Sequence, residues 1–178
     1  MGSIKKLILL LASICIELPL YIFLHEGGHS LVAILCGAKI THFSILNAHI
    51  NSQGGIYNTF TSSLLNIAGV LFPLFWSFLC LIFYCKNKEN DFYRIFTFFI
   101  CLMPVGSVFA WVLVPVLYML GNAPANDDVT KFINNSGIHP LWVILCAILI
   151  LSAMITFAWY KKVIQNFKHT VNEKSNLY

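Results

Sequence analysis

The chain has 178 residues, of which 58% are hydrophobic and 10% charged, and its mean hydropathy is +0.78. This apolar excess excludes an ordinary water-soluble domain, and it excludes a disordered chain, which needs low hydrophobicity and high charge. The net charge of +4 comes from eleven Lys and Arg residues spread along the chain, which disfavours a nucleic-acid-binding protein and leaves an integral membrane protein.

Four apolar stretches are long enough to cross a bilayer, which takes about 20 helical residues. They occupy residues 7–36, 61–84, 95–119 and 140–160. The first stretch is longer than the apolar core of a signal peptide, which favours a retained helix. We therefore predict an all-α membrane protein with about four transmembrane helices, forming a single polytopic membrane domain over residues 1–178 with a basic tail over 161–178.

The first predicted span contains the pattern H-E-x-x-H, from His25 through Glu26 to His29. On a helix the two histidines lie four residues apart on one face, where both imidazoles can bind one metal ion. Glu26 is turned about 100° from His25, so it can act on a water molecule beside the metal without being a ligand. Neutral imidazoles suit Zn²⁺, and a catalytic zinc site has three protein ligands. A polar helix face bonded to neighbouring helices is the alternative, but a charged residue inside a span favours function.

The segment between the first two spans has a different pattern. Residues 39–46 and 51–58 are rich in β-forming residues and surround turn-prone ones, which predicts a short β-hairpin. A strand edge beside the metal could hold an extended substrate by main-chain pairing, and a hairpin that merely covers the membrane surface is an equal alternative. We interpret His42 and His49 as loop residues rather than metal ligands.

Proline and glycine interrupt the third predicted span at Pro104, Gly106 and Pro115. Proline removes a backbone donor and clashes with the preceding helical turn. We therefore expect a kink in this span, which could open a cleft toward the metal.

Two histidines leave a zinc site one ligand short. The acidic candidates outside the expected cytoplasmic segments are Glu17, Asp127 and Asp128. Glu17 lies two helical turns before His25 and cannot share its ion, so we expect its side chain to snorkel or to bond near Pro19. The two aspartates precede Val-Thr-Lys-Phe, a pattern that also predicts a helix N-terminus. We predict that Asp127 caps this helix and that Asp128 is the third ligand, with Asp127 as the alternative.

The distribution of cations predicts the orientation. If the N-terminus is cytoplasmic, nine of the eleven Lys and Arg residues fall on the cytoplasmic side, and only Lys39 and Lys131 fall outside. We therefore expect both termini in the cytoplasm and the segments 37–60 and 120–139 on the opposite side.

Three motifs carry a resemblance to a known family. The run from His25 to Ile40 contains H-E-G-G-H, an apolar helical stretch, a glycine and a predicted strand. This run resembles the site-2 protease family of intramembrane zinc metalloproteases. The sequence Asn66-Ile67-Ala68-Gly69-Val70 is similar to the family's Ala-Gly-Pro region, with Val70 in place of proline. Asn122, Pro124 and the aspartate pair loosely resemble its acidic ligand region, although no glycine follows either aspartate.

The resemblance implies metal ligands from the first and a later span, and cleavage of a peptide bond in or beside the membrane. We therefore predict a zinc metalloendopeptidase in which His25, His29 and Asp128 hold Zn²⁺ and Glu26 acts as general base and then proton donor. The expected partners are a membrane-protein or membrane-bound peptide substrate and the lipid bilayer, with no nucleic acid. The alternative is a non-proteolytic zinc-binding membrane protein that binds or stabilises a partner membrane protein. Glu26 argues against that alternative, since a purely structural site needs no base.

Overall fold

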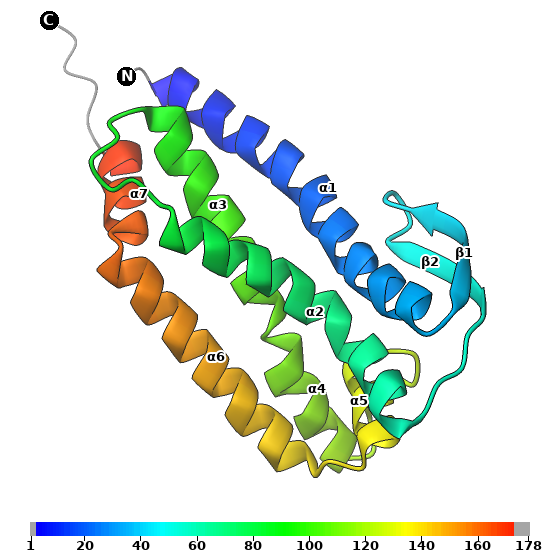
Figure 1. The fold of residues 1–178 in the computed structure, drawn as a ribbon. Helices are drawn as coiled ribbons and strands as arrows, with labels where there is room; N and C mark the ends of the chain where they lie inside the picture. The colour runs from blue at the N-terminus through cyan, green and yellow to red at the C-terminus, as the bar shows by residue number, and fades with distance from the viewer. Residues whose placement is uncertain (1–2, 173–178) are drawn as a thin grey trace, which may run out of the picture.

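The computed structural model describes residues 3–172, which form a bundle of long helices with one small sheet (Figure 1). The long helices and their continuation, in chain order, are α1 (Ser3–Leu35), α2 (Thr59–Ile82), α3 (Asp91–Ser107), α4 (Ala110–Met119) and α6 (Pro140–Tyr160). The shorter elements are β1 (Ala38–Ser44), β2 (His49–Gly54), α5 (Asp128–Ser136) and α7 (Val163–Asn172). The predicted fold class, a helical membrane protein with a short hairpin between its first two spans, is confirmed.

Within the described residues, four helical segments are long and apolar enough to cross a membrane. They are Ile4–Leu35, Thr59–Ile82, Asp91–Met119 and Pro140–Tyr160, which match the four predicted spans. The third segment begins four residues earlier than predicted because the Asn90 side chain accepts a hydrogen bond from the Tyr93 N–H and caps α3. Large apolar side chains such as Leu11, Phe75 and Leu149 are exposed on the outside of the bundle, as helices that face lipid require.

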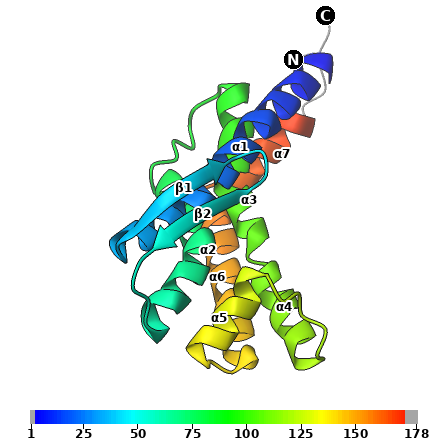
Figure 2. The same cartoon turned by 90° about the vertical axis from the view of Figure 1, so that its right-hand side faces the viewer.

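The hairpin is antiparallel, with Ala38 paired to Gly54 and Ser44 paired to His49. β2 begins and ends earlier than the predicted strand 51–58. It ends at Gly54 because Gly54 and Gly55 have φ angles of 77° and 87°, which turn the chain out of the extended conformation. His42 and His49, which we expected in loops, lie in β1 and β2. Figure 2 shows the hairpin lying across α1.

The third span is interrupted at residues 108–109, between α3 and α4. There the N–H groups of Val108 and Phe109 donate to carbonyls three residues earlier, at Val105 and Gly106, rather than four. The interruption lies between Pro104 and Pro115, in the stretch where the sequence predicts a kink. In contrast, α1 continues through Pro19.

Glycines allow α1 and α2 to approach closely. A Cβ on Gly28 of α1 would overlap the Ala68 carbonyl of α2. On α2, a Cβ on Gly69 would overlap the imidazoles of both His25 and His29. The close approach therefore sets the histidine face of α1 against α2.

The bundle has two distinct ends. At one end the Lys6 ammonium group donates to the Val171 carbonyl at 3.3 Å, and the Lys161 ammonium group donates to the Ile82 carbonyl at 2.7 Å. The start of α1, the end of α2 and α7 therefore lie together, while the hairpin and α5 lie at the opposite end (Figure 1).

Candidate metal centre

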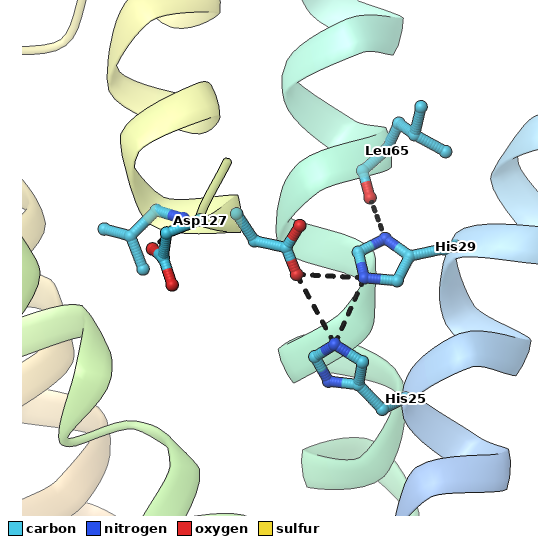
Figure 3. Close-up of polar contacts among 6 residues, drawn as sticks. His25, His29, Leu65 and Asp127 are labelled. Atoms are coloured by element: carbon cyan, nitrogen blue, oxygen red, sulfur yellow. Dashed lines mark hydrogen bonds and ion pairs between the residues drawn. The ribbon is translucent and has the colours of Figure 1, made fainter. Parts of the chain in front are cut away.

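Two helices distant in the sequence bring three ligand-type side chains together. His25 and His29 lie one turn apart on α1, and their Nε2 atoms are 3.2 Å from each other. Asp128 is the first residue of α5, and its Oδ2 lies 3.0 Å from His29 Nε2 and 3.4 Å from His25 Nε2 (Figure 3). These three residues form a group whose ligand atoms could hold a metal ion.

The size of this triangle fits a small divalent cation. Tetrahedral ligands that lie about 2.0–2.1 Å from zinc are separated from one another by about 3.3 Å. The three observed separations, 3.0, 3.2 and 3.4 Å, bracket this value. His25, His29 and Asp128 would therefore hold a small divalent cation through these three atoms.

The proton positions also favour a cation at the centre of the triangle. His29 Nδ1 lies 2.7 Å from the Leu65 carbonyl oxygen. Since a carbonyl can only accept, Nδ1 must carry the proton, which leaves a lone pair on Nε2 of the neutral ring. A carbonyl contact of this kind also orients metal-binding histidines in known sites. A single proton can form a hydrogen bond between only two of the three converging atoms. A divalent cation can accept a lone pair from all three.

The two neighbouring aspartates have different roles. Asp127 Oδ1 accepts a hydrogen bond from the Val129 N–H at 2.9 Å and caps α5. Its side chain lies away from the two imidazole rings (Figure 3). Because Asp127 is the cap, the Asp128 side chain can point toward the histidines, which is the arrangement that the sequence predicts.

The charge of Asp128 suits a metal ligand. Burial alone would raise the pKa of the Asp128 carboxyl. The hydrogen bonds that the His25 and His29 imidazoles donate when they are protonated, together with their positive charge in that state, outweigh burial and hold the pKa of the Asp128 carboxyl well below its usual range. The carboxyl is therefore ionised at neutral pH, which is the form that binds a divalent cation.

Glu26 lies in the same cavity as the three ligand-type residues. The cavity has a volume of about 410 Å³, and the Glu26 side chain in its wall is only 5% exposed. Its wall also includes Asn66 of α2 and three residues of β2, namely His49, Ile50 and Ser52. This cavity is therefore lined by the Glu26 carboxyl group, the candidate metal centre and one strand of the hairpin.

Sequence reasoning did not find several contributors to this site. Leu65 acts through its carbonyl, which no side-chain motif reveals, and Asn66 enters the cavity only because α1 and α2 pack closely. Gly69 belongs to the Ala-Gly motif noted in the sequence. The sequence does not show that it leaves space for the two imidazoles, because this depends on which face of α1 packs against it. His49 lines the cavity but is not one of the three grouped ligands, and its Nε2 donates to Asn51 Oδ1 at 2.7 Å.

The expected position of the Glu17 side chain is wrong. We expected it to snorkel to the surface or to bond near Pro19, but it is buried between helices. Its Oε1 has no hydrogen-bond partner among the residues that the structure describes.

Gly69→Ala should weaken metal binding without removing any ligand. The new methyl group would displace both imidazoles, and disturbance of the groups that orient ligands typically lowers metal affinity by about 10–100-fold. Zinc titration of the purified variant measures the effect. Gly106→Ala is the matched control, since a Cβ there meets nothing within 4 Å. Equal zinc affinity in the two variants would show that the imidazoles do not need the space at Gly69.

Comparisons of the chain with protein-family models, with curated proteins and with solved structures found no match. The resemblance to site-2 proteases therefore stays a prediction from the motifs. What the protein does has to be inferred from the geometry of its own residues.

Proposed function

We propose that this protein is a zinc metalloendopeptidase of the site-2 type, which hydrolyses peptide bonds of membrane-associated proteins in or near the bilayer. The observation that carries the proposal is the convergence of His25, His29 and Asp128 in one cavity with the buried carboxyl of Glu26. A structural zinc site needs no such carboxyl, and a carboxyl within a span is costly to retain without a function.

Different residues would bind the metal and transfer protons in this reaction. His25, His29 and Asp128 would hold zinc, which when bound activates water and stabilises negative charge on the substrate carbonyl oxygen. Glu26 accepts the proton of the attacking water and then delivers a proton to the departing amine. The Leu65 carbonyl keeps His29 in the tautomer that offers Nε2 toward the centre.

The hairpin supplies a place for the substrate. β2 pairs with β1 along one edge in a two-stranded sheet, so its other edge is available for main-chain hydrogen bonds. Because His49, Ile50 and Ser52 of β2 line the cavity, a peptide paired to this edge would lie beside Glu26. This arrangement supports a substrate bound in an extended conformation, as attack on a peptide bond requires.

We infer that the bundle end formed by the start of α1 and by α7 faces the cytoplasm. The distribution of Lys and Arg supports this orientation, since that end also carries the segment 83–90 with Lys86 and Lys88. His25 lies about 32 Å along α1 from Ile4, so the cavity would open toward the opposite side of the membrane.

Metal removal tests the proposal. The protein is purified in detergent, its zinc content is measured, and it is incubated with a broad panel of membrane-protein and membrane-peptide substrates. We expect about one zinc ion per chain, together with cleavage that a chelator abolishes and added zinc restores. Bound zinc with no cleavage across the panel would favour the non-proteolytic alternative. Absence of zinc binding would refute both.

A further inference from the structure

A second polar group inside the bundle takes no part in the metal centre. Glu17 of α1 is only 2% exposed, although its helix is one of the candidate membrane spans. Its Oε1 is buried without a hydrogen-bond partner among the described residues. An unsatisfied carboxyl in such surroundings destabilises the fold, and a ligand that bonded to it would reduce this cost.

Glu17 lines a cavity of about 260 Å³ between α1, α2 and α3, which we call the Glu17 cavity. The rest of its wall is mainly apolar and includes the aromatic residues Tyr21 and Trp76. Ser77 also lines it, but its hydroxyl already donates to the Cys101 carbonyl. No Lys, Arg or His is among the described residues that line the cavity, so none of these residues supplies a positive charge for Glu17.

The Glu17 cavity is separate from the metal cavity, because the two share no lining residue. Glu17 also stands outside the group of residues that could hold a metal. A hard divalent cation would need several oxygen ligands, whereas this cavity offers one carboxyl group. With one carboxyl group among mainly apolar residues, the cavity does not offer the ligands that an inorganic divalent cation needs.

We propose that the Glu17 cavity binds an organic ammonium group carried on a short apolar chain. The Glu17 carboxylate would pair with the ammonium group, and this attraction is stronger in a low-dielectric interior than in water. Aromatic rings attract cations over their faces, and Tyr21 and Trp76 both line the cavity, while its apolar wall would bury the chain. The volume is slightly below that of typical ligand pockets, which selects a small single-chain amine over a two-chain lipid.

Protection of Glu17 from chemical modification tests this proposal. The full-length protein in an uncharged detergent is treated with dicyclohexylcarbodiimide, an apolar reagent that modifies protonated carboxyl groups, and the modified peptide is identified by mass spectrometry. We expect modification at Glu17 that is absent in Glu17→Gln. Octylamine at ten times its Kd should slow the modification about tenfold, because a bound ammonium group both blocks the cavity and keeps the carboxyl ionised. Octanol, which has the same chain without the charge, should not protect.

Two further variants make the result specific. Trp76→Leu keeps Glu17 available to the reagent and should weaken protection by octylamine, which gives a second test if Glu17→Gln fails to fold. Asp128→Ala should leave the protection unchanged, because Asp128 does not line the Glu17 cavity. Lack of modification at Glu17, lack of protection by octylamine, or equal protection by octanol would each overturn the proposal.

Discussion

Glu26→Gln is expected to abolish peptide-bond cleavage while leaving the metal bound. Gln keeps the size of the side chain but cannot accept a proton, and loss of a positioned general base typically lowers a rate by about 10²–10⁴-fold. The metal ligands His25, His29 and Asp128 are untouched, so the zinc content should match that of the wild type. The measurement is the rate of substrate cleavage together with the zinc content of the same preparation.

Two substitutions serve as controls for Glu26→Gln. Glu26→Asp keeps a carboxylate but shortens the side chain by one methylene, so it should retain part of the activity. Glu89→Gln makes the same chemical change on the exposed segment between α2 and α3 and should leave activity unchanged. If Glu26→Gln cleaves at the wild-type rate, Glu26 is not the base.

Local patterns in the sequence were sufficient to predict much of the fold. Membrane-spanning helices depend on the length and composition of apolar runs, which can be read without knowledge of their neighbours. The capping role of Asp127 likewise follows from a local pattern, since a cap bonds within its own first turn. That assignment in turn left Asp128 free, so the choice between the two aspartates also followed from local chemistry.

Features that depend on how the helices face one another could not be predicted. α1 is apolar around most of its circumference, so its sequence does not specify which face turns inward. The burial of Glu17, the contact of His29 with the Leu65 carbonyl and the space left by Gly69 all depend on that rotation. The expectation that Glu17 would reach the surface was wrong because α2 and α3 enclose that part of α1.

Asp128→Ala is expected to abolish stable zinc binding, whereas Asp127→Ala should retain it. Removal of Asp128 leaves two imidazoles, and loss of a direct ligand should cost more than the roughly 10–100-fold that loss of an outer partner costs. Asp127→Ala removes only the cap of α5, which lowers stability by about 1 kcal/mol. Zinc content after dialysis and the thermal unfolding temperature, measured on both variants, separate the two effects.

Asp127→Asn is the matched control for the cap. Asparagine caps helices about as well as aspartate, so this variant should keep both the zinc and the unfolding temperature of the wild type. Far-ultraviolet circular dichroism establishes that Asp128→Ala remains helical when it loses zinc. Equal zinc retention in Asp127→Ala and Asp128→Ala would refute the assignment of Asp128. Since Asp128 is the ligand that joins α5 to α1, that outcome would also remove the link between the two helices on which the proposed centre depends.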